Sequence, residues 1–358
     1  MNIAFILNGP SKVPIGGHKI VFEYANALVS RGYNVNIYFD CDDGKNSYHI
    51  PKNLMFARRW IVGKYRINWF RIDKRVGLYP IKKITKKNVG ANDIVITTAA
   101  IPALRTYETL NGHKNIINFV QGYENWCLPE EKLQEIYQKG KKNIIISQWL
   151  KDKIEEPAKS RVEYIPNGLD LSMWKEEKAI KERNPFTVAM LYSSLETKGS
   201  VYGLRAIQLA KKQLPELQVK LFGTTAKNEN IPDWVQYYEN ATPKQVKDIY
   251  NQSVIFLNPS LGEGFGLTSI ESMACGCMLI TTDYDATKDY AKNMENAIVV
   301  PRKDYEKMAK AIVTAATNRS LSIRIAENGR RYVNEYFLWE NSFRRFEQTL
   351  LECIRETK

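Results

Sequence analysis

The chain has 358 residues, of which 44% are apolar and 25% are charged, and its net charge is +13. This length fits two ordinary domains, since a single core of that size is unusual. Its 20 Tyr, 13 Phe and 7 Trp supply bulky core material and exclude a disordered chain. No segment approaches the roughly 18 continuous apolar residues of a membrane span. The short apolar run Ile3–Leu7 lacks a basic flank, so it predicts a buried strand and not a signal peptide.

Five cysteines form a sparse, odd-numbered set. Cys275 and Cys277 make a C-x-C pair, but no second pair and no histidine lies near them in the sequence. We therefore expect small buried thiols in a reducing cytoplasm, in preference to a zinc site or a disulfide framework.

The positive charge is concentrated between Met55 and Lys87, where eleven basic residues face one acid, Asp73. Aromatic residues alternate with them: Trp60, Tyr65, Trp69, Phe70 and Tyr79. One explanation is a solvated basic face. A second is docking on an anionic membrane leaflet, because cations are attracted to such a surface and aromatic rings settle at the headgroup level. Nucleic-acid binding ranks last, since no recognition motif accompanies the charge.

Strand-like and helix-like segments alternate along the chain, which predicts parallel sheets with helical crossovers and an α/β fold. In the first half the expected strands are Ile3–Leu7, Val35–Phe39, Ile94–Thr97, Ile116–Val120 and Asn143–Ser147. A helix is expected from about Lys19 to Arg31, after Gly16 and Gly17 and before Gly32. In the second half the expected strands are Phe186–Leu191, Gln218–Phe222, Val254–Leu257 and Met278–Thr281.

The break between the halves is expected near Pro166–Arg183, where a strand-like Val162–Ile165 gives way to Pro-Asn-Gly and a charged run. We predict two doubly wound, Rossmann-like domains, 1–172 and 173–336, facing a central cleft. Ligands of such sheets gather at the carboxyl ends of the strands, so the loops there should carry the function.

The most informative segment is Asn258–Gly276, which follows a short buried strand and opens a helix near Gly266. Glycines at 264 and 266 allow the backbone to approach a ligand closely. Free amides at a helix N-terminus favour an anion, so a diphosphate would fit there. Glu263 and Glu271 frame this position, and each carboxylate can accept hydrogen bonds from a vicinal diol. Alternatively, Glu263 is an ordinary loop acid and Glu271 a solvated helix residue.

These residues carry a resemblance. Glu263-x7-Glu271, within Pro-Ser-x-x-Glu-Gly-Phe-Gly-Leu and Glu-Ser-Met-Ala-Cys-Gly, resembles the E-x7-E signature of family-four retaining glycosyltransferases of the GT-B fold. Further similarities occur in the family's order along the chain: Gly16-Gly17, Pro166-Asn167-Gly168-Leu169-Asp170, Lys198-Gly199 and Phe337-Leu338-Trp339. The last implies that 337–358 forms a helix returning to the first domain.

The resemblance implies roles for individual residues. Glu263 would hold donor-sugar hydroxyls, Lys198 would neutralise the diphosphate, and Gly17 would face it from the other domain. Glu271 would bind the ribose. Further substrate contacts are expected at Phe265, Gly266, Leu267, Thr268, Ser194 and Asn167, and the base would lie near Gly223 and a turn at Tyr238–Asn240.

Two positions depart from the family pattern. Ser193 stands where an arginine is usual, so more of the leaving-group stabilisation would fall on Lys198 and the helix amides. Gln121 stands where a histidine is common, after the strand Ile116–Val120. Of the three histidines, His49 and His113 are expected in surface loops. His18 is either a cleft residue or a solvent residue at the helix start.

The segment Gln121-Gly122-Tyr123-Glu124 is similar to Gln-Asp-Tyr-Glu segments of bacterial polysaccharide rhamnosyltransferases of the same family. It favours dTDP-rhamnose as donor, with UDP- and GDP-sugars as alternatives. Glu124 would then orient the acceptor hydroxyl, or else cap a loop.

Two acidic clusters invite a metal interpretation. Asp283-Tyr284-Asp285 has the D-x-D form that binds metal in another glycosyltransferase fold, and Asp40–Asp43 follows a strand. GT-B enzymes generally need no metal, so we expect neither a metal nor a cofactor beyond the nucleotide-sugar co-substrate.

Together these observations predict a cytoplasmic glycosyltransferase, peripheral on the inner face of the membrane if the basic segment docks there. It would move a sugar, with retention, to a polysaccharide or lipid-linked acceptor. The alternatives are a sugar-nucleotide epimerase or phosphorylase on the same fold, or a non-catalytic nucleotide-binding partner of an active transferase.

Overall fold

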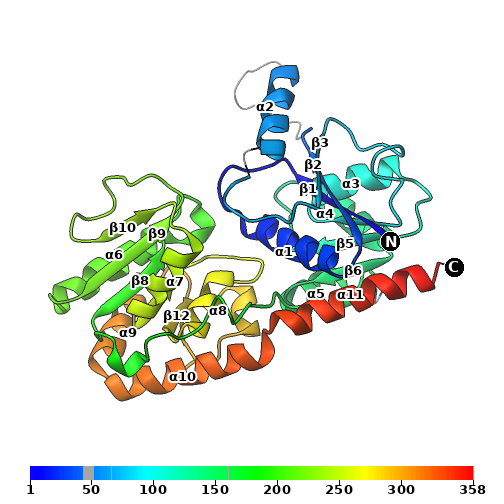
Figure 1. The fold of residues 1–358 in the computed structure, drawn as a ribbon. Coiled ribbons are helices and arrows are strands. Elements are labelled where there is room, and N and C mark those ends of the chain that lie inside the picture. The colour runs from blue at the N-terminus through cyan, green and yellow to red at the C-terminus, as the bar shows by residue number, and fades with distance from the viewer. Residues whose placement is uncertain (43–51, 66, 160, 358) are drawn as a thin grey trace. The chain divides into compact units, whose positions relative to one another are not determined.

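The alternation of strands and helices folds into two compact units in the computed structural model, which describes residues 1–42, 52–65, 67–159 and 161–357 (Figure 1). The first unit comprises Met1–Pro166 and Ser342–Lys358, and the second Asn167–Asn341. The predicted boundaries, after residue 172 and before residue 337, lie a few residues from these bounds.

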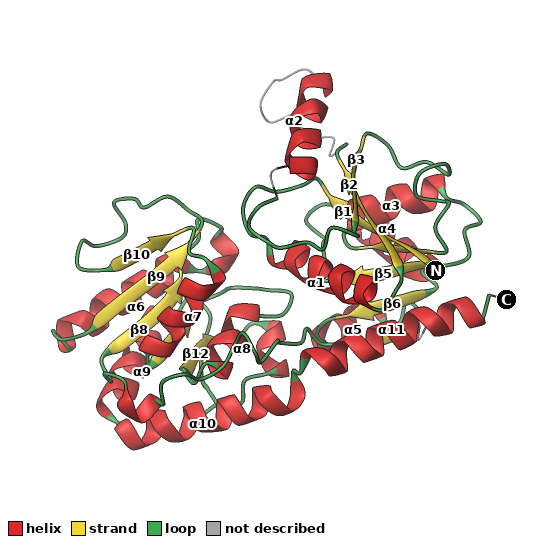
Figure 2. Ribbon diagram, in the orientation of Figure 1, coloured by secondary structure: helices red, strands yellow, loops and turns green. Residues whose placement is uncertain are grey.

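The first unit is built on a seven-stranded parallel sheet in the order β3-β2-β1-β4-β5-β6-β7 (Figure 2). Its strands are β1 (Asn2–Asn8), β2 (Asn34–Asp40), β3 (Gly77–Ile81), β4 (Ile94–Thr97), β5 (Ile116–Val120), β6 (Lys142–Ile145) and β7 (Val162–Tyr164). Its helices are α1 (Gly16–Ser30), α2 (Lys52–Tyr65), α3 (Ala100–Thr109), α4 (Glu130–Lys139) and α5 (Gln148–Ile154). The last helix, α11 (Trp339–Arg355), begins in the second unit and continues in the first.

Neighbouring residues of β5 show how helices cover both faces of this sheet. The ring of Phe119 packs against Tyr24 of α1 and Phe346 of α11. The side chain of Asn118 points the other way, where it accepts a hydrogen bond from Tyr107 of α3 at 3.0 Å and donates to the Ile136 carbonyl of α4 at 3.0 Å. Successive strand residues face opposite sides, so β5 is buried on both.

The second unit has a six-stranded parallel sheet in the order β10-β9-β8-β11-β12-β13. Its strands are β8 (Thr187–Leu191), β9 (Gln218–Gly223), β10 (Gln236–Glu239), β11 (Ile255–Asn258), β12 (Met278–Thr282) and β13 (Ile298–Val300). Its helices are α6 (Ser200–Gln213), α7 (Pro243–Gln252), α8 (Leu267–Ala274), α9 (Tyr305–Thr317) and α10 (Arg319–Tyr336), with short 3₁₀ turns η1 (Ile180–Glu182), η2 (Glu196–Lys198) and η3 (Asp285–Asp289). Local sequence starts several of them: Thr242 and Gln245 form a capping box at α7, and Asn318 caps α10.

The predicted fold class is confirmed, because each unit is a doubly wound α/β sheet of the Rossmann type. All nine strands named from the two halves are present, with ends shifted by at most two residues. The helix expected from about Lys19 begins earlier, at Gly16. The prediction missed α2, β3, β10 and β13, whose short or polar sequences carry little periodicity.

The cysteines are unbridged thiols, and Cys41, Cys275, Cys277 and Cys353 are buried as predicted, whereas Cys127 is only half-buried. Burial raises the pKa of the Cys277 thiol to about 11, so it stays protonated, and it donates a hydrogen bond to the Tyr250 carbonyl at 3.1 Å. Within the described residues, no helix is long and apolar enough to span a bilayer.

Candidate functional site

The predicted donor residues gather at one edge of the second sheet. The order of the strands reverses between β8 and β11, and the loops that follow these two strands carry Ser193–Lys198 and Asn258–Gly266. Gly223 ends β9 beside them. The carboxyl edge at such a reversal point is where open α/β sheets bind ligands.

Gly266 shapes the loop at the start of α8. Its backbone φ is +120°, and a Cβ there would lie 2.6 Å from the hydroxyl oxygens of Tyr284 and Tyr290, so a larger residue would not fit. The amides of Ser269 and Ile270 bond to the Gly266 carbonyl, whereas those of Leu267 and Thr268 donate no hydrogen bond within the described residues. These two amides and the helix dipole make a position that favours an anion.

Lys198 and Glu263 meet beside this helix start. The Lys198 ammonium lies 2.9 Å from Oε2 of Glu263, with the two side chains 27% and 9% exposed. Gly199, at φ +62°, lets η2 pack against the loop after β11, because a Cβ there would collide with the Pro259 carbonyl. The Leu261 amide then bonds to the Thr197 carbonyl at 2.7 Å, which joins the two loops.

The other oxygen of Glu263 is held by residues that sequence reasoning missed. Oε1 accepts hydrogen bonds from the Ser260 hydroxyl and, at 3.4 Å, from the Asn258 amide. Both residues lie within the Asn258–Gly276 segment, but Asn and Ser are common in loops, so nothing in the sequence indicated this role. A carboxylate held on both oxygens is oriented before any ligand arrives.

Glu271 is buried, with 5% of its surface exposed, so the alternative of a solvated helix residue is wrong. Its charge acts on Tyr250, whose pKa is raised well above the usual value chiefly by burial and then by Glu271. The carboxylate lies one turn into α8, the helix that starts at the anion-binding position.

The predicted base-binding residues lie beside the two loops that follow β8 and β11. The Ser193 amide bonds to the Ser200 hydroxyl at 2.9 Å, and the Ser194 amide to the Thr225 hydroxyl at 3.1 Å. The Asn240 amide bonds to the Gly223 carbonyl at 2.7 Å. Tyr238 belongs to the strand β10 and not to a turn, since its pairing with Phe222 extends the sheet.

Phe265 and Asn167 lie inside the second unit. Phe265 is 3% exposed and packs its ring against Phe337, with 5.5 Å between centroids. The Leu169 amide bonds to the Phe337 carbonyl at 2.7 Å, so the Pro-Asn-Gly segment pairs with the segment before α11. Asn167 is 2% exposed, and its Oδ1 accepts no hydrogen bond from the described residues. The Phe265 ring therefore packs within the second unit, and the predicted substrate contacts of Phe265 and Asn167 stay predictions.

Gly17 and Gln121 contact one another in the first unit. The strand order of its sheet reverses between β1 and β4. The Gln121 amide donates to the Gly17 carbonyl at 3.3 Å, and a Cβ on Gly17 would lie 3.2 Å from Oε1 of Gln121. Gln121 therefore holds the start of α1. The predicted roles of both residues toward a substrate stay predictions.

His18 faces the core of the first unit, which contradicts the alternative of a solvent residue. Its ring is 7% exposed and lies near Phe22 and Phe39. Burial lowers its pKa to about 4, so the ring is neutral near pH 7. Nδ1 has no hydrogen-bond partner within the described residues.

The Glu124 side chain is hydrogen-bonded to a backbone amide of its own unit. Its carboxylate accepts a hydrogen bond from the Ala100 amide at 2.7 Å, which caps the N-terminus of α3, and burial raises its pKa. It also lines a cavity of about 20 Å³, room for one water molecule. His113 lies in the loop between α3 and β5, as predicted, and is half-buried, with its Nε2 2.9 Å from the Asn92 carbonyl oxygen. His49 lies outside the described residues.

The acidic clusters form ordinary protein contacts. Asp283 accepts a hydrogen bond from the Arg302 amide at 3.0 Å and lies 3.6 Å from its guanidinium. Asp40 pairs with Arg105 at 2.8 Å. Across the described parts of the chain, no group of three His, Cys, Asp or Glu side chains is arranged to hold a metal ion.

Comparison with known proteins bears on the second unit. Residues 172–332 match the family profile described as "Glycosyl transferases group 1". This match covers most of the second unit and less than half of the chain. The donor loops, α8 and both glutamates all lie inside the matched segment.

Two curated relatives are similar over part of the chain. The poly(glycerol-phosphate) alpha-glucosyltransferase of Bacillus subtilis is 24% identical over 157 residues, 41% of this chain and 23% of that protein. The capsular polysaccharide biosynthesis glycosyltransferase CapM of Staphylococcus aureus is 34% identical over 104 residues, 27% of each chain. The matches thus span about a quarter of each relative's length.

Two solved structures share the fold over the whole chain. The sucrose-phosphate synthase of Thermosynechococcus elongatus has a TM-score of 0.75 at 16% identity and covers 99% of both chains. The Anabaena protein HepE, solved with UDP-glucose, has a TM-score of 0.74 at 13% identity and covers 98% of this chain and 100% of its own.

Proposed function

We propose that this protein is a retaining glycosyltransferase that moves a sugar from a nucleotide-diphosphate donor to a polysaccharide or lipid-linked acceptor. The observation that carries the proposal is the Lys198–Glu263 pair beside the free amides of Leu267 and Thr268. The group 1 domain match and the relatives named as polysaccharide-building transferases support it.

Each part of the loop has a task in this proposal. The α8 amides and Lys198 bind the diphosphate and stabilise the charge that develops as it leaves. Glu263 binds donor-sugar hydroxyls, and Glu271 binds the ribose diol. In front-face transfer the departing diphosphate oxygen accepts the proton of the acceptor hydroxyl, so the protein supplies positioning and positive potential and no nucleophile.

For the donor we propose dTDP-rhamnose first, on the Gln121–Glu124 resemblance to rhamnosyltransferases of family four, and UDP-glucose second. The second is supported by HepE, which was solved with UDP-glucose. The base would stack near Gly223 and Asn240.

A thermal-shift screen against dTDP-, UDP- and GDP-sugars tests the donor. A ligand that binds only the folded protein at a hundredfold excess over its Kd adds about 2.7 kcal/mol to stability. No shift with any of these donors would refute the proposal. Conversion of a donor without any acceptor would favour the epimerase alternative.

For the acceptor side we propose that the basic segment docks on an anionic membrane leaflet. Its helix α2 turns Leu54, Trp60 and Ile61 outward, at 61%, 39% and 45% exposure, next to the exposed Arg58 and Lys64. It packs its inner side on β3, because Gly63 lies against Pro80 (Figure 1). Exposed apolar side chains flanked by cations suit the headgroup region of an anionic bilayer.

Co-sedimentation with vesicles containing anionic lipid tests this surface. We expect binding that weakens with salt and is lost when Leu54 and Ile61 are changed to Ser, whereas the same change at Val201 of α6, exposed in the second unit, leaves binding unaltered. Equal binding to neutral vesicles would refute the electrostatic part of the proposal.

A further inference from the structure

A pair of fully buried tyrosines lies directly beneath the donor loop. Tyr284 and Tyr290 flank η3, and neither exposes any surface. Their hydroxyl groups are hydrogen-bonded to each other, and a Cβ on Gly266 would lie 2.6 Å from both hydroxyl oxygens. Burying two hydroxyl groups is costly unless they are paired, so their placement under this loop calls for an explanation.

The two hydroxyls complete a chain of hydrogen bonds across the base of the loop. The Asn258 amide donates to the Tyr284 hydroxyl at 3.1 Å and to the Ser269 hydroxyl at 2.8 Å. The Tyr290 hydroxyl donates to Ser269 at 3.4 Å, so Tyr284 is left to donate to Tyr290. This series of hydrogen bonds connects the end of β11 to the first turn of α8.

These hydrogen bonds fix the orientation of the Asn258 side-chain amide. Its nitrogen is directed to the tyrosine and serine hydroxyls, and its oxygen accepts the Ser260 amide at 3.3 Å. Ser260 in turn donates its hydroxyl to Oε1 of Glu263, and the Asn258 nitrogen reaches the same oxygen at 3.4 Å. The orientation of the Glu263 carboxylate therefore depends on the Tyr284 hydroxyl, two contacts away, and on the Tyr290 hydroxyl, three contacts away.

Both phenols keep their protons near neutral pH. Burial, with the nearby Glu263 charge, raises the pKa of Tyr290 to about 12 and that of Tyr284 well above its usual value. They therefore remain hydrogen-bond donors near neutral pH.

We propose that Tyr284 and Tyr290 are positioning residues for the donor sugar: through Asn258 and Ser260 they orient the Glu263 carboxylate toward the sugar hydroxyls. This inference rests on the proposed function, because it takes Glu263 as the group that binds the sugar. It assigns the tyrosines no contact with the nucleotide or its phosphates. Their loss should thus affect the sugar part of the donor and spare the rest.

The test compares the affinity of a nucleotide sugar with that of its nucleoside diphosphate. The probes are UDP-glucose with UDP and dTDP-rhamnose with dTDP, each titrated calorimetrically into the full-length protein. Tyr284→Phe and Tyr290→Phe keep the ring and remove only the hydroxyl. We expect each to lower the ratio of sugar-nucleotide to nucleotide affinity about fivefold, the effect of one lost hydrogen bond, while nucleotide affinity changes less than about twofold.

Tyr107→Phe is the matched control, because it removes a buried hydroxyl of the first unit that bonds to Asn118. It should lower stability to a similar extent and leave the ratio unchanged. An unchanged ratio in both Tyr284→Phe and Tyr290→Phe would overturn the inference, as would equal losses for nucleotide and nucleotide sugar. A wild-type protein that binds neither these probes nor any other donor of the thermal-shift screen refutes the proposed donor site itself, and the inference with it, without any variant.

Discussion

The ammonium of Lys198 lies 2.9 Å from the carboxylate of Glu263, and the two residues come from loops that follow different strands. Without a donor they neutralise each other. A diphosphate at the start of α8 would compete with Glu263 for the lysine, while sugar hydroxyls would compete with the lysine for Glu263. The ion pair thus holds both side chains in place until a bound donor replaces it, with the diphosphate on Lys198 and the sugar hydroxyls on Glu263.

Replacing either partner should impair transfer. We expect Lys198→Ala and Glu263→Ala each to lower kcat/KM by roughly 10²–10³-fold, the range for losing one group that stabilises developing charge. Because the residues touch, the double variant should lose less than the sum of the two. Steady-state kinetics with the donor selected by the screen measures this, with Lys310→Ala of α9 as an exposed control. Full activity of Glu263→Ala with every donor would show that its assigned role is wrong.

Gly266 should tolerate no side chain. Gly266→Ala places a Cβ 2.6 Å from two buried hydroxyl oxygens at a φ of +120°, so strain and overpacking add. We expect a loss of about 2–5 kcal/mol in unfolding free energy. Gly262→Ala is the control in the same loop, because a Cβ there meets no atom within 4 Å, and it should change stability by less than about 0.5 kcal/mol. Chemical unfolding of both variants measures the difference; equal stabilities would contradict this account of the loop.

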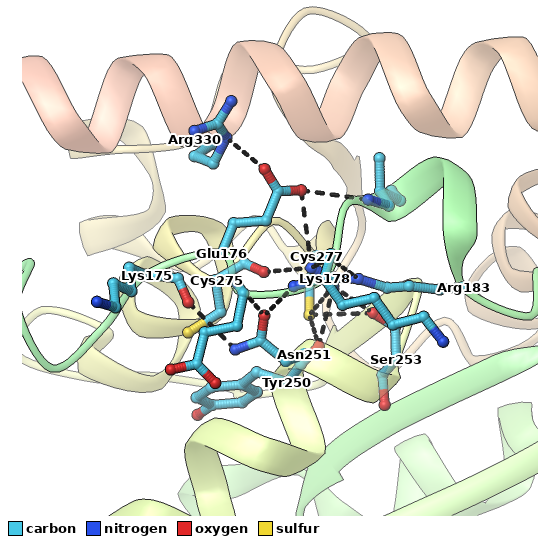
Figure 3. Close-up of polar contacts among 12 residues, drawn as sticks. Lys175, Glu176, Lys178, Arg183, Tyr250, Asn251, Ser253, Cys275, Cys277 and Arg330 are labelled. Atoms are coloured by element: carbon cyan, nitrogen blue, oxygen red, sulfur yellow. Dashed lines mark hydrogen bonds and ion pairs between the residues drawn. The ribbon is translucent and has the colours of Figure 1, made fainter.

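Arg183 should be essential to the second unit (Figure 3). Its buried guanidinium donates to the carbonyls of Lys178, Tyr250, Ser253 and Cys275, which join η1 to the ends of α7 and α8. Arg183→Met removes a hydrogen-bond donor from all four carbonyls and breaks the contact with Glu176, which keeps its pair with Arg330; this should cost about 3–5 kcal/mol. Arg345→Met breaks a surface pair with Glu163 and should cost about 1 kcal/mol or less. Thermal unfolding that ranks the two variants the other way would refute this assignment.

His18 should make stability depend on pH. Its pKa falls from 6.5 in the unfolded chain to about 4 in the folded protein, because burial disfavours the charged ring. The unfolded chain therefore binds the extra proton between these values, and stability present above pH 6.5 is lost as the pH falls toward 4. The loss should reach about 3 kcal/mol. Urea unfolding of wild type and His18→Gln at pH 7 and pH 5 isolates it; a parallel fall in both proteins would contradict it.

Much of the fold could be predicted from the sequence because its central strands are short apolar runs between turn residues. Strands β4 and β5 were predicted to the residue, since buried parallel strands have few polar positions. Edge strand β10 was missed because Gln236–Glu239 carries polar and aromatic residues typical of a loop. Helix α2 was missed because its charge masked a helical pattern.

The Asn258–Gly266 loop was predicted as a donor-binding site from its glycine spacing and from Glu263 and Glu271. The groups that orient Glu263 were not predicted. Tyr284 and Tyr290 follow the loop by some twenty residues and reach it only because β12 runs beside β11. His18 was ambiguous for a related reason. Its position at a helix start suggested solvent, and only the packing of α1 on β2 turns the ring into the core.

The most direct measurement is a crystal structure of the protein with UDP-glucose or dTDP-rhamnose bound. The account predicts diphosphate oxygens within hydrogen-bond distance of the Leu267 and Thr268 amides and of the Lys198 ammonium, with sugar hydroxyls on Glu263. A nucleotide bound elsewhere, with the Lys198–Glu263 pair intact, would contradict it.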